Sequence, residues 1–221
     1  SNRRVAPRWN AKDRTVAETA GSGVDRHRAP RSDRRRRAGH DNLWRELPDD
    51  IVSRFTHRVG SLHAVRLENG TLVHAFSRDL PNGLTVDAYM DAHTDSFESL
   101  VREMPVDIVA HPTLVALPFR KVDTDILWNE EREARMVEAL FAAGTAFEIS
   151  SRYPPHERLV RRAVDRGVRI SLGSDGHTLE QVADVERPLA TARALGARDE
   201  DLYDPTRHGS KTGGAGATTA K

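Results

Sequence analysis

Five histidine and acidic side chains follow short apolar runs of the sequence, and each could bind a metal ion or transfer a proton. They are His63, His111, Glu148, Asp175 and His177. Imidazole and carboxylate groups are ligands that suit Zn, Mn or Fe. The chain contains no cysteine, which excludes thiolate zinc sites, iron–sulfur clusters and cysteine nucleophiles. Any metal ion must therefore be held by His, Asp and Glu.

The segment Gly173–His177, with the sequence GSDGH, carries the most specific of these patterns. Its two glycines let the backbone turn closely. An Asp-X-His pair on such a tight turn can direct its two side chains to neighbouring ions. Asp175 and His177 are therefore candidate ligands of a site that holds more than one ion.

Each of these residues taken alone also has an ordinary structural interpretation. A histidine before a proline, such as His111, is common in loops, and Glu148 could pair with Arg152 or Arg158. His74 could replace or assist His63, or it could lie on the face of a strand. Because all five candidates follow apolar runs, their shared position favours a functional origin.

The elements that must position these residues alternate in type. Apolar runs predict strands, and apolar residues at helical spacing predict helices. Strands are expected at Arg58–Val65, Val106–Ala110, Thr145–Ile149 and Val168–Leu172, and the run Gly70–Phe76 is either a short strand or a loop. Helices are expected at Asp87–Glu103, at Glu130–Ala143 with Gly144 as its C-cap, from Pro155 to Gly167, and at Leu179–Leu195, which Pro188 should kink or split.

Strands that alternate with helices of this length predict an α/β fold built from βαβ units with a parallel sheet. In such folds, functional residues gather at the carboxyl ends of the strands. We therefore expect the five candidates to meet at one edge of the sheet.

Charge divides the chain into three parts. Residues 1–40 contain twelve Lys/Arg and four Asp/Glu, so their net charge is +8 and that of the remaining residues is −7. We expect 1–40 to be a basic disordered leader, 41–208 to be the folded domain, and 209–221, rich in Gly and Ala, to be a flexible tail.

Composition limits where the chain is expected to be located and which classes of partner it is expected to bind. Its apolar runs are far shorter than the roughly 20 residues of a membrane helix, and no signal peptide pattern begins it. A cytoplasmic location is the default expectation. The basic leader could contact phosphates of a nucleic acid, but the acidic body and the aromatic content of 5% argue against nucleic acid as the partner.

Three segments resemble the C-terminal half of the polymerase and histidinol phosphatase (PHP) family. They are DIVAHPT (107–113), FEIS (147–150) and GVRISLGSDGHTLEQVADV (167–185), and ATARALG (190–196) is similar to the family's closing helix. The resemblance extends over about 58–205. It implies a distorted seven-stranded, TIM-like (β/α) barrel with up to three metal ions at its C-terminal face. It also implies hydrolysis of phosphate monoesters such as histidinol phosphate.

The resemblance also implies roles for individual residues. His63 and His111 would share one divalent ion, and Asp175 and His177 would complete the neighbouring ions. Glu148 matches a recurrent position at a strand end, and His74 is an alternative to His63. A small phosphorylated substrate would need cations, and Arg78, Arg120, Lys121 and Arg152 lie near predicted loops. Arg152 is the preferred substrate-binding residue, because it follows FEIS at a strand end.

The sequence departs from the family in its N-terminal half. The family's first strand carries a His-X-His pair, which this sequence lacks, and residues 41–208 are fewer than the roughly 250 of a typical (β/α) barrel. We therefore expect a partial barrel with an incomplete metal site and an open sheet edge, which a homo-oligomer would cover. The resulting hypotheses are a metal-dependent phosphoesterase and, alternatively, a non-catalytic PHP-fold remnant with a binding or structural role.

Overall fold

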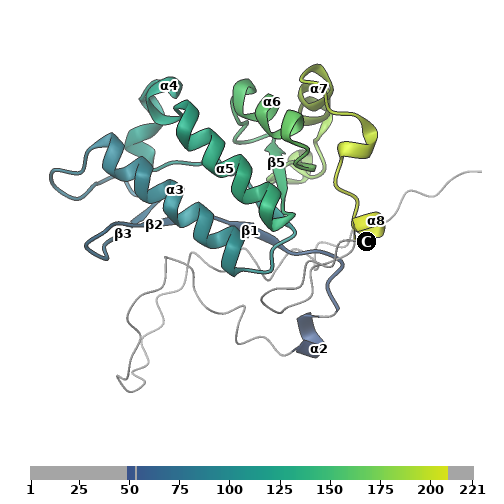
Figure 1. Ribbon diagram of the computed structural model, residues 1–221, viewed down its shortest axis with the longest axis horizontal. Coiled ribbons are helices and arrows are strands. Elements are labelled where there is room, and N and C mark those ends of the chain that lie inside the picture. Colours follow the sequence, from purple (N-terminus) through teal and green to yellow (C-terminus); the bar gives the residue numbers. More distant parts are fainter. Residues whose placement is uncertain (1–48, 53, 209–221) are drawn as a thin grey trace, which may run out of the picture.

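The computed structural model describes residues 49–52 and 54–208 of the chain (Figure 1). The predictions for the leader at 1–40 and the tail at 209–221 lie outside the described residues. No helix within the described part is long and apolar enough to cross a membrane.

Four parallel strands form the central sheet, as predicted from the alternation of elements. They are β1 (Val59–Ser61), β4 (Ile108–Ala110), β5 (Ala146–Ser150) and β6 (Ile170–Gly173), paired in the order β1-β4-β5-β6. On the outer side of β6, Ile170 forms an isolated bridge with Leu202. Among the described strands, no pairing joins β1 to β6, so these four strands form an open sheet rather than a closed barrel. The oligomer that would cover the edge of β1 stays a prediction.

The strand predicted over Arg58–Val65 is divided in two. Its first half is β1, and its second half is β2 (Ala64–Arg66), which pairs antiparallel with β3 (Leu72–His74) in a separate two-stranded sheet. The run Gly70–Phe76 therefore contains a strand. The division leaves His63 between β1 and β2, where the chain leaves the parallel sheet.

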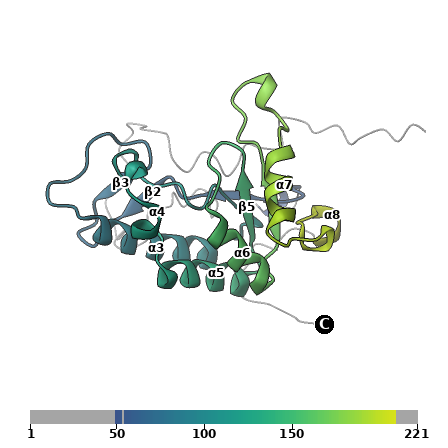
Figure 2. The ribbon, with the colours of Figure 1, turned by 90° about the horizontal axis from the view of Figure 1, so that it is seen from above.

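Three long helices cover one face of the central sheet. Helices α3 (Val86–Glu103), α5 (Glu130–Ala143) and α6 (Glu157–Arg166) lie side by side on that face, and α7 (Glu186–Ala194) packs against β5 and β6 (Figure 2). The shorter elements are α2 (Asp49–Val52), η3 (Leu117–Lys121), α4 (Thr124–Leu127), η4 (Leu179–Gln181), η5 (Asp199–Asp201) and α8 (Pro205–His208).

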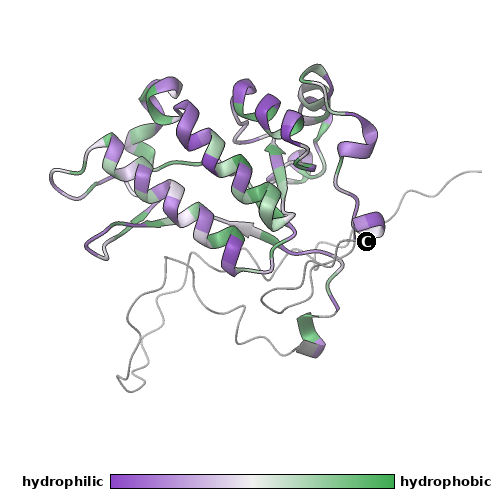
Figure 3. Cartoon of the chain, viewed as in Figure 1, coloured by the Kyte–Doolittle hydropathy of each residue, from purple (hydrophilic) through white to green (hydrophobic). Residues whose placement is uncertain are grey.

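The hydrophobic core lies between the helix layer and the sheet. Successive strand residues point to opposite faces, and the register sets Val109, Phe147 and Ile170 side by side. All three are fully buried in one cluster with residues of the helices. Hydrophilic residues predominate on the outer sides of α3 and α5 (Figure 3). The opposite face of the sheet carries mostly small or polar side chains: Ser61, Ala110, Ala146, Glu148, Ser150 and Ser171.

The glycine C-caps were predicted correctly, but the predicted effects of Pro155 and Pro188 on their helices were wrong. Gly144 and Gly167 end α5 and α6 with φ values of 61° and 81°. However, α6 does not begin at Pro155, because His156 is its N-cap and keeps an extended backbone (φ −74°, ψ 150°). The His156 ring contacts Glu133 of α5 at 2.6 Å, a tertiary interaction that local sequence does not reveal.

The helix predicted at Leu179–Leu195 is also shorter than expected. The region divides into η4 and α7 before Pro188 is reached. Pro188 is the third residue of α7, where a backbone N–H has no partner within the helix. The proline therefore fits the first turn of the helix and causes no kink there.

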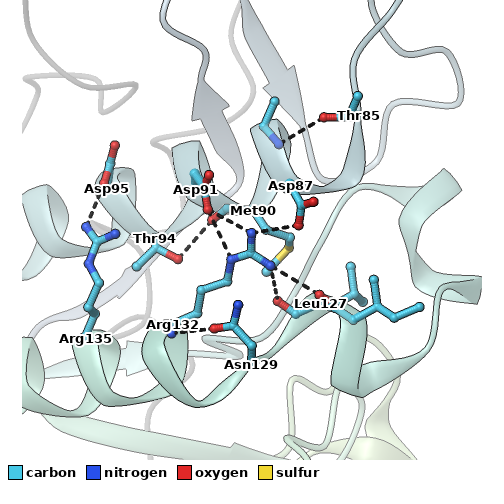
Figure 4. Close-up of polar contacts among 12 residues, drawn as sticks. Thr85, Asp87, Met90, Asp91, Thr94, Asp95, Leu127, Asn129, Arg132 and Arg135 are labelled. Atoms are coloured by element: carbon cyan, nitrogen blue, oxygen red, sulfur yellow. Dashed lines mark hydrogen bonds and ion pairs between the residues drawn. The ribbon is translucent and has the colours of Figure 1, made fainter.

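Arg132 of α5 ties three helices together (Figure 4). The Arg132 side chain is 8% exposed, and its guanidinium donates to Asp87 at 3.0 Å and to Asp91 at 2.8 Å, both on α3. It also donates to the carbonyls of Ile126 and Leu127 in α4 at 3.2 and 3.3 Å. One buried cation thus satisfies acceptors from two neighbouring helices.

Replacing Arg132 with Met, which keeps the apolar stem, should lower the free energy of unfolding by about 1–3 kcal/mol, because the buried carbonyl of Leu127 loses its donor. Arg135→Met is the matched control on the same helix. Arg135 pairs with Asp95 and Glu98 in a more exposed position, and its loss should cost less than about 1 kcal/mol. Urea denaturation measures the free energy of unfolding of both variants, and equal losses of stability would contradict the role of Arg132.

Candidate functional site

The candidate residues follow the carboxyl ends of the parallel strands. His63 lies two residues after β1, His111 directly follows β4, Arg152 lies two residues after β5, and Asp175 lies two residues after β6. Because the strands are parallel and in register, these ends share one edge of the sheet. The fold therefore brings the loops that carry these residues to the same side of the molecule.

His63 and His111 form the tightest pair among the candidates. Their Nε2 atoms lie 3.4 Å apart, and their rings are stacked with centroids 5.1 Å apart and an interplanar angle of 9°. Two imidazole ligands on one tetrahedral zinc ion, each about 2.0–2.1 Å from it, would have nitrogen atoms about 3.3–3.4 Å apart. The spacing of the pair is therefore compatible with a shared metal ion, and it is also that of a long hydrogen bond between the two rings.

The environment of His111 keeps its ring neutral. The residue is 7% exposed, and its pKa is lowered from 6.5 to about 4, first by burial and then by repulsion from His63, while Asp175 opposes the shift. Neutral imidazole is the form that ligates metals. At neutral pH, His111 is therefore in the protonation state that a metal ion needs.

His111 also has an unusual backbone. Its φ is 32°, in the left-handed region that non-glycine residues rarely adopt, and it precedes Pro112, a position that normally favours an extended conformation. Such strain costs on the order of 1–3 kcal/mol. Its backbone N–H donates to Glu148 Oε2 at 2.7 Å, and its carbonyl accepts from the Leu114 N–H at 3.0 Å. These two hydrogen bonds stabilise the strained conformation.

Arg152, which follows β5, contacts Asp175 and His177 on the loop after β6. The Arg152 Nε lies 3.9 Å from Asp175 Oδ2. His177 Nδ1 lies 2.9 Å from Arg152 Nη1 and 2.8 Å from the carbonyl oxygen of Asp175. The guanidinium can only donate and the carbonyl can only accept, so this ring nitrogen can serve one of them at a time.

The structure does not place all the candidates alike. His74 is paired with Ala64 in the hairpin, whereas the His63 carbonyl accepts from the Ala75 N–H. The His74 side chain is exposed, whereas that of Val73 beside it is buried. Among the described residues, no group of three or more His, Cys, Asp or Glu side chains is arranged to hold a metal ion. The His63–His111 pair is the part of the candidate ligand set whose spacing fits an ion.

Arg120 lies near the histidine pair, although sequence analysis preferred Arg152. Its guanidinium donates to the Val115 and Ala75 carbonyls, each at 3.0 Å. It also lies 5.2 Å from the ring centroid of Phe76 and 5.4 Å from that of Tyr153. Among the described residues, no carboxylate forms an ion pair with it. No local pattern marks this residue, because η3 carries it back to the site nine positions after His111.

The two aromatic rings connect Arg120 to the histidines. The Phe76 ring makes an edge contact with His63, with centroids 5.9 Å apart, and the Tyr153 ring makes one with His111 at 5.8 Å. Arg120 also contributes to the lowered pKa of His111, which is consistent with its proximity. The site thus combines a pair of imidazoles with a fixed cation, an arrangement suited to an anionic ligand beside a metal ion.

No family model matches the sequence, and no curated protein sequence matches it. Solved structures do resemble the fold. One, assigned as the histidinol phosphatase HisK of Listeria monocytogenes, has a TM-score of 0.51 and 15% sequence identity, over 65% of this chain and 61% of that one. Another, the histidinol phosphate phosphatase of Lactococcus lactis in complex with Zn, L-histidinol and phosphate, has a TM-score of 0.51 and 12% identity, over 71% of this chain and 61% of that one.

This chain therefore spans about three fifths of each of these two proteins (61%). At such low identity the likeness concerns the fold alone. The mixed α/β architecture and its parallel sheet are similar to the fold of the histidinol phosphatases, and the chain has a PHP-like fold.

Proposed function

We propose that this chain is a metal-dependent phosphoesterase of the PHP type, in which His63 and His111 hold a divalent ion and the substrate is a small phosphate ester. The observation that carries the proposal is the 3.4 Å separation of the two Nε2 atoms. The PHP-like fold supports it, and so does the zinc, histidinol and phosphate bound by the Lactococcus lactis protein. Zn, Mn and Fe all suit imidazole ligands.

The division of labour follows from the positions of the side chains. A divalent ion at the histidine pair would supply Lewis acidity toward a phosphoryl oxygen. His63 and His111 would hold the ion in their neutral forms, and Asp175 is the carboxylate that the loop after β6 offers as a further ligand. Burial excludes water from His111, which strengthens its interactions with charged groups nearby.

Arg120 and Arg152 would bind the phosphate. Arginine presents several N–H donors in a planar fork that matches phosphate oxygens. Arg120 is fixed in advance by two carbonyls and two rings, so little side-chain entropy is lost when an anion binds. Arg152 contacts Asp175 and His177 and would have to leave them to reach a substrate.

The alternative function is a non-catalytic PHP-fold protein with a binding or structural role. Two observations favour it: the described residues contain no group of three ligands suited to an ion, and the Arg152 cation lies at the carboxylate and the imidazole that a second ion would need. An incomplete metal site could still bind one ion and a phosphate without turnover. Metal content and hydrolysis together distinguish the two functions.

Protein purified without chelator should bind fewer than three Zn²⁺ ions per chain. His63→Ala and His111→Ala should each weaken Zn²⁺ binding by about 100-fold or more, because mutating even a residue that only orients a metal ligand typically lowers the metal affinity 10–100-fold. His74→Ala is the matched control and should leave the affinity unchanged. Isothermal titration calorimetry and elemental analysis measure these values. A loss in His74→Ala equal to that in His63→Ala would contradict the assignment of His63 as a ligand, and three bound ions would contradict the incomplete metal site.

Arg120→Ala and Arg152→Ala should each raise KM for p-nitrophenyl phosphate about tenfold or more, because a hydrogen bond to a charged group contributes about 1.5–3 kcal/mol. Arg161→Ala, an exposed arginine on α6, is the control and should leave KM unchanged. If the wild-type protein shows no turnover, the Kd for inorganic phosphate takes the place of KM, and the alternative function gains support. An arginine whose loss changes neither value does not bind the phosphate.

A further inference from the structure

Glu148 is a buried carboxylate beside the candidate metal site. It belongs to β5, is 8% exposed, and points to the face of the sheet opposite the helices, since its neighbours Phe147 and Ile149 belong to the core. Its Oε2 accepts the 2.7 Å hydrogen bond from the backbone N–H of His111. The carboxylate thus links the end of β4 to the middle of β5.

Gly173 makes room for this carboxylate on the other side. A Cβ atom at position 173 would lie 1.8 Å from Glu148 Oε1 and 2.4 Å from its Cδ. The backbone of Gly173 has no positive φ, so the conformation does not require glycine there. The reason for glycine is the close approach of the Glu148 side chain, which lies across strands β5 and β6.

We propose that Glu148 is a positioning residue for His111 rather than a metal ligand, and that Gly173 is the position that makes this role possible. The inference rests on the proposed role of His63 and His111 as ligands. His111 has a φ of 32° and precedes proline, so its peptide would relax toward an extended conformation without an acceptor for its buried N–H. Such a change would turn the ring away from His63.

The test compares Glu148→Ala, Glu148→Gln and Gly173→Ala. Glutamine has the same shape, and its side-chain oxygen can accept the His111 N–H, so Glu148→Gln should keep the Zn²⁺ affinity of the wild type. Glu148→Ala and Gly173→Ala should each raise the Zn²⁺ Kd by about 10–100-fold, as for other residues that orient a ligand. Gly173→Ala should do so although Glu148 is still present, because the new methyl group displaces its carboxylate.

The double variant sharpens the comparison. Once Glu148 is Ala, adding Gly173→Ala should cause little further loss, because both changes break the same hydrogen bond and their effects should not add. Titrations are run at a temperature where circular dichroism shows every variant folded, so a purely structural effect would leave the Kd unchanged. If Glu148→Ala does not fold, the comparison of Glu148→Gln with Gly173→Ala still decides the proposal.

A second readout uses metal-free protein. The amide of His111, followed by NMR, should exchange faster with solvent in Glu148→Ala and Gly173→Ala and keep its wild-type protection in Glu148→Gln. If the wild type does not bind Zn²⁺, the proposed function fails, and this amide still decides the positioning role. A Zn²⁺ Kd as weak in Glu148→Gln as in Glu148→Ala would identify Glu148 as a ligand, and an unchanged His111 amide in Gly173→Ala would overturn the inference.

Discussion

The register of the parallel strands is the constraint on which the candidate site depends. Phe147 and Ile149 are fully buried in the core, so Glu148 between them must point to the opposite face. Register places Ser150 beside Gly173 and Ser61 beside Ala110, which sets the ends of all four strands at one edge. A slip of one residue would turn Glu148 into the core and remove the acceptor of the His111 N–H. Packing of apolar side chains on one face thus fixes polar geometry on the other.

Two adjacent charged residues of α5, Arg132 and Glu133, hold together the helices that pack on this sheet. Arg132 joins α5 to α3 and α4, while Glu133, fully buried, contacts His156, Arg158 and Arg162 at 2.6, 2.8 and 3.3 Å. A buried charge without partners would be strongly destabilising, so α3 and α6 are held in defined positions on either side of α5. Because His156 is the N-cap of α6, the contact with Glu133 also fixes one end of the loop that carries Arg152 and Tyr153.

Sequence periodicity predicted those elements whose boundaries are set locally. Glu130–Ala143 forms a helix with the predicted limits, and Gly144 and Gly167 end their helices because glycine adopts a positive φ without strain. The division of the first strand into β1 and β2 could not be predicted, because both halves are apolar and only pairing partners distinguish them. Arg132 and Glu133 resemble the solvated charges of a helix surface, and their burial follows from the packing of other helices.

The candidate site was also predictable only in part, because some of its features depend on long-range contacts. The ends of parallel strands are recognisable from the sequence, which is why His63, His111 and Asp175 were identified. The exposure of His74 depends on how the β2–β3 hairpin packs, and the approach of Arg120 depends on the path of η3. Both are long-range features with no local signature, so sequence alone left His74 as an alternative and Arg120 as one of four candidate cations, with Arg152 preferred.

Backbone strain concentrates where local rules and the fold disagree. The non-glycine residues with positive φ in the described part of the chain are His111, Asp175 and Ala183, and all three lie in the segments that follow β4 and β6. At the ends of α5 and α6, by contrast, the glycine caps agree with the fold, as expected where local sequence and fold are consistent. Strained residues persist only where surrounding contacts over-determine them, and they cluster at functional sites. At His111 the contact is the Glu148 carboxylate, held against a glycine on the next strand, which gives the strain at this edge of the sheet a specific structural support.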